Sequence, residues 1–197
     1  MPGTLDQAKK REEWLAPLLH FGGDAGSGIS GLRFLEAEDL PEPARALLAH
    51  EQDMTPTLRD YHAEALVLEV LAAERAGSAL VRKVLLRGRE SGRVVEFGAI
   101  RIDLSQLAGR VRQRVEAGRD PLGGILEEEG LRHSSQPRGF FSALIAPKLG
   151  KVIGASLDTR LYGRCNQLTL EDGSVFAEIV ELLPPHRPGA SAGGAGT

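Results

Sequence analysis

The 197-residue chain is short of the features that mark several classes of protein. Its single cysteine, Cys165, excludes a disulfide within the chain. A net charge of −3 gives no general attraction for nucleic acid. No apolar run reaches the length of about 20 residues that a membrane-spanning helix needs, and the N-terminal residues lack the apolar core of a secretory signal. These absences predict a cytoplasmic protein with no nucleic-acid partner and no membrane span.

Signatures of metal and nucleotide binding are weak as well. The five histidines are scattered, and no two of them have a spacing that is usual for metal ligands. Gly26, Gly28 and Gly31 match the pattern GxGxxG, but a dinucleotide-binding loop must follow a buried strand and open a helix. The residues before these glycines have a helical pattern, so we interpret the segment as a flexible loop. We expect neither a metal ion nor an organic cofactor.

Apolar and charged residues, by contrast, are present in ordinary proportions. They make up 42% and 26% of the chain, as in globular proteins, and the length suits one domain with a substantial core. Periodicity, caps and turn residues predict helices at 5–19, 40–50, 56–63 and 104–117, and strands at 65–73, 79–87, 93–103, 151–157, 162–170 and 174–183. Asp103 and Gln106 have the spacing of a capping box for the fourth helix.

Three segments have a less regular pattern. Residues 131–151 fit either a helix or a strand. The strand 65–73 is apolar on both faces, which indicates a strand that is covered on both sides. The final segment, 187–197, is rich in Pro, Gly and Ala and is predicted to be disordered.

The strand 79–87, ALVRKVLLR, carries the most informative charge. Side chains alternate along a strand, so Arg82 shares a face with Leu80, Val84 and Leu86. An arginine keeps its charge in such an apolar row and therefore needs an anion there. The anion is either a carboxylate of the protein or a carboxylate of a ligand, which a guanidinium binds with two parallel hydrogen bonds. The strand alone leaves both interpretations open.

Two glutamates in the last predicted strand, Glu178 and Glu181, lie on opposite faces. Both faces are mostly apolar, so at least one glutamate needs a partner or a role. An ion pair with Arg82, Arg101 or Arg164 would be structural. A carboxylate whose pKa is shifted by burial against an arginine could instead act in catalysis.

Two further features have plain structural interpretations. Arginines recur at positions 110, 112, 114 and 119, and on a helix they form a solvated face more often than a phosphate-binding surface. The segment 121–124, PLGG, can turn N–H groups toward an anion, but it also suits a connector between two helices. The local sequence favours the connector.

Six short segments, in order, resemble the chorismate lyase family, and most closely its actinobacterial-type branch, which makes 4-hydroxybenzoate. They are DMTPTL at 53–58, LVRKVLL at 80–86, FGAIRI at 97–102, PLG at 121–123, LYGR at 161–164 and VELLPP at 180–185. The resemblance implies the α+β fold of that family, with a central antiparallel sheet and surrounding helices that enclose a ligand pocket. It implies an N-terminal helix and Gly-rich loop at 1–39, a chorismate lyase-like domain at 40–186 and a tail at 187–197.

The resemblance also implies roles for the residues of these motifs. Arg82 would bind the ring carboxylate of the substrate and take part in catalysis, and Glu181 would be the catalytic carboxylate, with Glu178 as the alternative. One family arginine is out of register here, so Arg101 or Arg164 would bind the second carboxylate. The backbone N–H of Leu122 would face the ligand. The implied substrate-binding set is Met54, Thr55, Arg82, Arg101, Leu122, Gly123 and Arg164.

The implied activity is that of a carbon–oxygen lyase, which eliminates pyruvate from chorismate to give 4-hydroxybenzoate. Aromatisation of the ring supplies the driving force, so the protein has to hold two carboxylates and place one acid–base group. The partners would be chorismate and the aromatic product, bound by a monomer without a metal or cofactor.

Two other functions stay open. Ligand-sensing domains of some bacterial transcription regulators share this fold and bind small effectors, here a small aromatic acid, without chemistry. They usually follow a DNA-binding helix-turn-helix, for which residues 1–39 are too short and too rich in glycine. A related lyase that makes another hydroxybenzoate is the other alternative.

Overall fold

The computed structural model describes residues 3–22, 28–156 and 159–185, with side chains from residue 9 onward. Its helices are α1 (Gly3–Leu19), α3 (Ala44–Leu48), α4 (Met54–His62), α5 (Gly109–Ala117), α6 (Leu122–Glu128) and α7 (Pro147–Ile153), with 3-10 turns η1 (Ala37–Asp39) and η2 (Leu104–Gln106). Its strands are β1 (Ile29–Leu35), β2 (Leu66–Ala76), β3 (Ala79–Gly88), β4 (Val94–Asp103), β5 (His133–Ile145), β6 (Arg160–Leu170) and β7 (Val175–Leu183).

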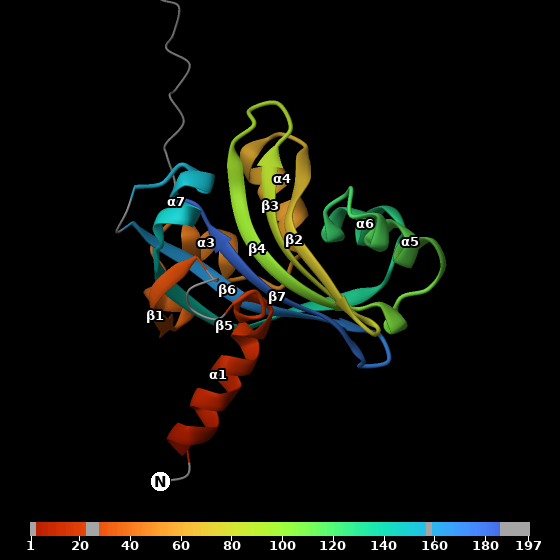
Figure 1. Cartoon of the computed structure of the whole chain (residues 1–197), viewed down its shortest axis with the longest axis horizontal. Coiled ribbons are helices and arrows are strands. Elements are labelled where there is room, and N and C mark those ends of the chain that lie inside the picture. Colours follow the sequence, from red (N-terminus) through yellow and green to blue (C-terminus); the bar gives the residue numbers. More distant parts are fainter. Residues whose placement is uncertain (1–2, 23–27, 157–158, 186–197) are drawn as a thin grey trace, which may run out of the picture.

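All seven of these strands form one antiparallel sheet in the order β1-β5-β6-β7-β4-β3-β2 (Figure 1). The expected α+β fold with a central antiparallel sheet is therefore confirmed. The hairpin predicted around Glu171, Asp172 and Gly173 is also present, as β6 and β7. Gly173 has a φ of 85°, which favours glycine, and the Asp172 side chain accepts a hydrogen bond from the Ser174 N–H.

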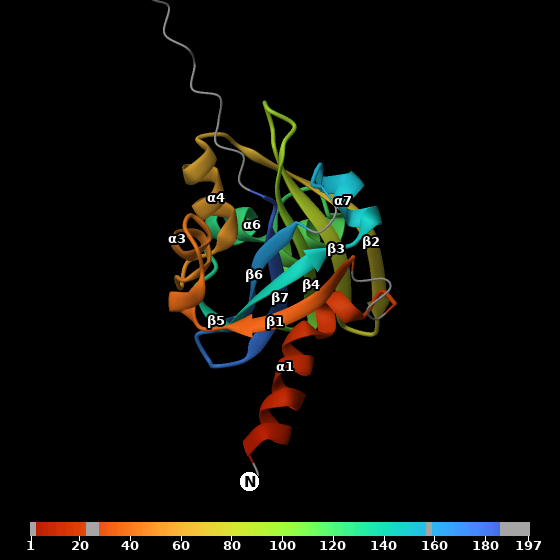
Figure 2. The ribbon, with the colours of Figure 1, turned by 90° about the vertical axis from the view of Figure 1, so that its left-hand side faces the viewer.

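The two faces of the sheet carry different layers. On one face, Leu15 and Leu18 of α1 pack with Phe97 and Phe141 of the sheet, and α7 joins the same cluster. Leucines three apart lie on the same side of a helix, so the last turns of α1 form the contact. Figures 1 and 2 show that the N-terminal end of α1 extends away from the sheet. The opposite face is covered by α3 and α4 in one cluster and by α5 and α6 in another.

Strand β2 differs from its sequence-based prediction. It lies at the edge of the sheet and is not covered on both sides, since Val70 and Leu71 are 36% and 38% exposed. The ladder with β3 shifts register between Val70 and Ala72, which leaves Leu71 outside the pairing. An apolar pattern indicates that a strand can be buried, but it does not fix the strand's place in the sheet.

Two other segments were predicted wrongly. Residues 151–157 were expected to form a strand, but α7 runs to Ile153, because Pro147 suits the first turn and Gly154 ends the helix with a φ of 69°. The helix expected at 104–117 is divided into η2 and α5. The Asp103 side chain accepts a hydrogen bond from the Ser105 N–H, and the first turn closes as a 3-10 helix.

The glycine-rich segment does not form a dinucleotide-binding unit. Gly26 and the predicted tail 187–197 lie outside the described residues. Gly28 precedes β1, Gly31 lies within it with a φ of 56°, and β1 leads into η1 and not into an α-helix. Residues 131–151, whose sequence fitted either a helix or a strand, form β5 and the start of α7.

Candidate functional site

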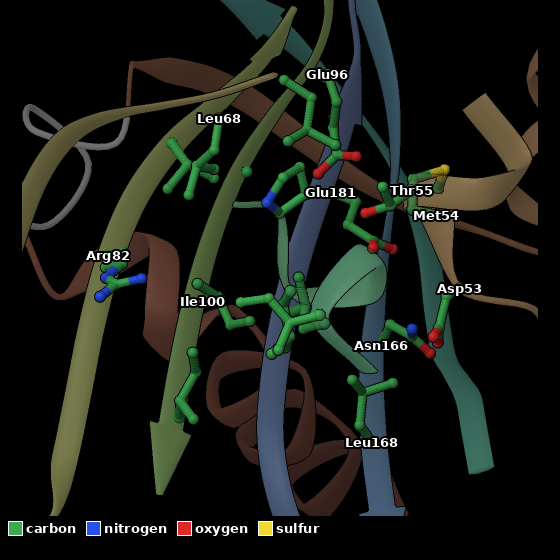
Figure 3. Close-up of a pocket in the computed structure, with 18 of the residues that line it drawn as sticks. Asp53, Met54, Thr55, Leu68, Arg82, Glu96, Ile100, Asn166, Leu168 and Glu181 are labelled. Atoms are coloured by element: carbon green, nitrogen blue, oxygen red, sulfur yellow. The ribbon is translucent and has the colours of Figure 1, made fainter. Parts of the chain in front are cut away.

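A pocket opens on the sheet face that α4, α5 and α6 cover (Figure 3). The space between its lining atoms, including the part that is open to solvent, is about 690 Å³. The apolar lining consists of Met54, Leu68, Val84, Leu86, Ala99, Ile100, Ile102, Val115, Pro121, Leu122, Ile125, Leu168 and Ile179. The polar lining consists of Asp53, Thr55, Arg82, Glu96, Asp120, Asn166 and Glu181. A mostly apolar pocket with a few polar groups is typical of a small-molecule site.

Strand pairing arranges the polar side chains in cross-strand rows on this face. The first row contains Arg82, Ile100, Ile179 and Asn166, from β3, β4, β7 and β6. The second row contains Val84, Gly98, Glu181 and Arg164, and Glu96 lies beyond it, opposite Leu86. Arg82 and Asn166 are three strand spacings apart, so their backbones lie about 14 Å from each other. The rows of Arg82 and Glu96 are four residues apart along β4, which corresponds to about 13 Å. Arg82 and Glu96 therefore stand at different ends of the pocket.

Gly98 keeps the floor of the pocket open between these ends. A Cβ at this position would lie 2.9 Å from Glu96 Oε1 and 3.3 Å from Val84 Cγ2. Any larger residue would therefore displace the Glu96 carboxyl group from its present place.

Arg82 is buried, with 7% of its surface exposed, and within the described residues it bonds to backbone carbonyls alone. Its Nη2 donates to the Val115 carbonyl at 2.5 Å and to the Glu116 carbonyl at 3.3 Å, at the end of α5. The C-terminal end of a helix favours a cation. Among the described residues, no carboxylate pairs with this guanidinium. Burial lowers the pKa of Arg82, although an arginine stays charged at neutral pH.

Arg164 is fully buried, and each of its three side-chain nitrogens donates to an acceptor. Its Nε donates to Glu181 Oε2 at 2.5 Å. Nη1 donates to the carbonyls of Leu48 and His50 at 3.2 and 2.9 Å, and Nη2 donates to the carbonyl of Gln52 at 3.1 Å. The guanidinium thus fixes the segment between α3 and α4 against the sheet and holds Glu181 in a buried ion pair.

Glu96 is 5% exposed, and its Oε2 has no hydrogen-bond partner among the described residues. Burial raises the pKa of Glu96 well above its usual value, and the nearby Glu181 carboxylate raises it further, while Arg164 opposes this. Both effects favour the protonated, neutral form of the carboxyl group. Figure 3 shows the carboxyl groups of Glu96 and Glu181 on the side of the pocket away from Arg82.

Asn166 lines the pocket at the level of Arg82, three strands away from it. Its Nδ2 donates to Ser135 Oγ at 3.0 Å, and the Ser135 hydroxyl donates to the Gln52 carbonyl at 3.4 Å. Because the hydroxyl proton is committed to Gln52, Ser135 Oγ accepts from Asn166, which assigns the amide orientation. Asn166 Oδ1 is buried and has no partner among the described residues.

The rim of the pocket is fastened by Asp53, directly before α4. Its Oδ2 lies 2.9 Å from His133 Nε2, and His133 Nδ1 lies 2.8 Å from the Leu131 carbonyl. The hydrogen bond with Asp53 raises the pKa of His133. Thr55, two residues further on, packs so closely against Gly123 that a Cβ there would lie 3.0 Å from it. The starts of α4 and α6 thus meet over the pocket.

The structure brings most of the predicted site residues together. Met54, Thr55, Arg82, Leu122 and Glu181 line the pocket, while Gly123 and Arg164 lie directly behind its wall. Arg101 is exposed and, like Glu178 opposite it, is absent from the lining.

Sequence reasoning missed Glu96, Asn166 and Asp53. Glu96 shares a strand face with Gly98 and Ile100, so a charge in an apolar row was visible there, as it was for Arg82. Asn166 and Asp53 gave no such signal, because an amide and a helix-capping acid are ordinary at a strand and before a helix.

The arginines around α5 form ion pairs, in agreement with the predicted solvated face. Arg114 lies 2.8 Å from Asp120 and 3.0 Å from Glu129, and Arg112 lies 3.4 Å from Glu116. In the described parts of the chain, no cluster of three metal-binding side chains occurs. No helix there is both long and apolar enough to cross a membrane.

No protein-family model matches the sequence, and no curated protein matches it either. The fold is nevertheless that of an effector domain of known structure. The chain matches the effector domain of PhnF from Mycobacterium smegmatis with a TM-score of 0.52 and 12% identity, over 69% of this chain and 90% of that one.

Two further structures resemble the chain less closely. PhnF from Mycobacterium smegmatis itself has a TM-score of 0.49 and 11% identity over 66% of this chain, which spans 63% of the PhnF chain. A GntR-family transcriptional regulator from Bacillus cereus has a TM-score of 0.44 and 12% identity, over 61% of this chain and 92% of that one.

The match to the PhnF effector domain contradicts the prediction of a carbon–oxygen lyase. That structure is an effector domain and not a chorismate lyase. Chorismate, pyruvate and 4-hydroxybenzoate are therefore not supported as substrate and products. The motif residues also have structural partners, since Arg82 binds the end of α5 and Glu181 binds Arg164. The motifs indicated the fold correctly, but the activity was wrong.

Proposed function

We propose that this chain is a non-catalytic ligand-binding module that senses a small aromatic acid. The observation that carries the proposal is Arg82, a buried cation that lines the pocket and has no carboxylate partner among the described residues. A buried charge needs an anion, and a ligand carboxylate can supply it. The apolar walls would cover the body of the ligand. The effector-domain fold of the PhnF match supports a sensing role.

Calorimetric titration with benzoate and with benzamide tests this proposal. Benzamide has the same shape without the charge, so we expect benzoate alone to bind. Arg82→Gln should weaken benzoate binding by about tenfold or more, because a charge-assisted bidentate pair is lost. Arg101→Gln is the matched control, since Arg101 lies outside the pocket.

Two results would contradict the proposal. Equal binding of benzoate and benzamide would show that Arg82 does not select an anion. Unchanged affinity in a folded Arg82→Gln protein would show that the acid binds elsewhere.

A further inference from the structure

We propose that the ligand of this pocket is a zwitterion, with a primary ammonium group at the Glu96 end as well as an acid group at Arg82. This inference rests on the proposed function, because it names the class of ligand for the same pocket. It assigns Glu96, which the acid-binding proposal leaves unused, to recognition of the second group.

The charge balance of the lining is the first argument. Asp53 is paired with His133, Asp120 with Arg114 and Glu181 with Arg164. The two remaining ionisable groups of the described lining have opposite signs, and they are Arg82 and Glu96. A ligand that carries one negative and one positive charge compensates both of them without leaving a net charge in the pocket.

The hydrogen-bonding atoms at the Glu96 end are the second argument. Glu96 Oε2 is a buried side-chain atom that lacks a partner among the described residues, and the Glu96 side chain lines this pocket. Glu181, in the neighbouring cross-strand row, uses Oε2 for Arg164. The end therefore offers carboxyl oxygens from two side chains, among which an ammonium group can share its three donors. A hydroxyl group has one donor.

The position of the two charges limits the shape of the ligand. Arg82 and the level of Glu96 are about 13 Å apart along the strands, and both side chains extend into the space between them. The ammonium and the acid must therefore lie at opposite ends of the molecule. An α-amino acid, in which the two groups share one carbon, does not meet this requirement.

Binding of such a ligand is coupled to the release of a proton. Burial and Glu181 raise the pKa of Glu96, which favours its protonated carboxyl group. The charged groups that act on it are Glu181 and, behind Glu181, Arg164. An arriving ammonium favours the ionised carboxylate, so Glu96 loses its proton to solvent. The ammonium keeps its own protons.

The test is a series of acids that differ only in the end group. The aromatic set is para-(aminomethyl)benzoate, para-(hydroxymethyl)benzoate and para-methylbenzoate, and the straight-chain set is ε-aminohexanoate, ε-hydroxyhexanoate and hexanoate. Calorimetry in two buffers of different ionisation enthalpy gives both the affinity and the number of protons released. We expect the amine of at least one set to bind about tenfold or more tightly than its methyl analogue, with release of a proton.

Variants separate the contribution of Glu96 from that of the acid site. Glu96→Gln keeps the size of the side chain but cannot ionise, so the preference for the amine and the proton release should both disappear. Glu178→Gln, on the same sheet but outside the pocket, should preserve them. Thermal unfolding of each variant checks that it is folded.

The outcomes distinguish the two proposals. Methyl or hydroxymethyl analogues that bind as tightly as the amines would overturn the zwitterion and leave the acid-binding function standing. An amine preference that survives Glu96→Gln would overturn the assignment of Glu96. Failure of all six acids to bind the folded protein would overturn the acid-binding function itself.

Discussion

Two buried arginines on one face of the sheet have opposite surroundings. Arg164 is fully buried, donates to a carboxylate and to three carbonyls, and ties the segment before α4 to β6 and β7. Arg82 is almost as buried but bonds only to two carbonyls at the end of α5. A buried charge whose hydrogen bonds are complete belongs to the fold, and one whose charge is uncompensated is available for a ligand.

The same comparison applies to the two glutamates of the pocket. Glu181 is held by Arg164, while Glu96 keeps an oxygen without a partner. The ion-paired residues, Arg164 and Glu181, therefore share one cross-strand row. The residues without a charged partner, Arg82 and Glu96, lie on either side of that row. Four substitutions test whether this division between structure and binding is real.

The largest expected effect is that of Arg164→Gln. It removes the partner of buried Glu181 and releases three carbonyls, so we expect a loss of about 3–5 kcal/mol in the free energy of unfolding. Urea denaturation followed by circular dichroism measures this loss. A loss below about 1 kcal/mol would show that the buried pair does not hold the fold.

Arg82→Gln should have a smaller effect on stability. The hydrogen bonds to Val115 and Glu116 are weakened, but an uncompensated buried charge is removed at the same time. We expect a loss of about 1 kcal/mol by urea denaturation. A loss as large as that of Arg164→Gln would place Arg82 among the structural residues and abolish the distinction between the two arginines.

Glu96→Gln should stabilise the ligand-free protein at neutral pH, by about 1 kcal/mol. The folded-state pKa of Glu96 is raised, so the folded protein retains a proton that the unfolded chain releases above about pH 4.3. Wild-type stability therefore falls as the pH rises from that value toward the raised pKa. The variant lacks this penalty, so its advantage should be present at pH 7 and absent at pH 4. Chemical denaturation at both pH values measures it, and an advantage that does not change with pH would argue against a neutral Glu96.

The smallest effect is expected at the rim, where His133→Gln removes the pair with Asp53. The folded-state pKa of His133 is raised, so its contribution is complete below about pH 6.5 and is lost as the pH rises through the raised value. The variant should be less stable than the wild type by about 0.5 kcal/mol at low pH. The two proteins should converge at high pH in thermal unfolding scans. A constant difference would mean that the ring packs against Phe176 without a role for its charge.

Alternation along single strands predicted much of the site. Arg82 and Glu181 were singled out because a charge in an apolar row needs a partner, and both lie in the pocket. The partners could not be predicted. Arg82 reaches carbonyls 33 and 34 residues away, and Arg164 reaches carbonyls more than 100 residues away. Contacts of this range depend on strand order, which periodicity does not specify.

Glu96 carried the same signal as Arg82, a charge in an apolar row, but its burial could not be read from the strand alone. Residues 94–100 of β4 are all buried, because both faces of the sheet are covered there. Alternation therefore does not separate a buried from an exposed side chain in this strand. The short motifs likewise identified the fold, but they could not separate a binding module from an enzyme of the same architecture.

The irregular edge of β2 has a consequence for how the molecule behaves in a crowded solution. An open strand of 11 residues with exposed Val70 and Leu71 is a template on which a second chain could extend the sheet. The register shift at Leu71 interrupts the row of free N–H and C=O groups, and the charged side chains of Glu69, Glu74 and Arg75 flank it. The register shift and the charges therefore disfavour aggregation in which further chains add as strands to this edge.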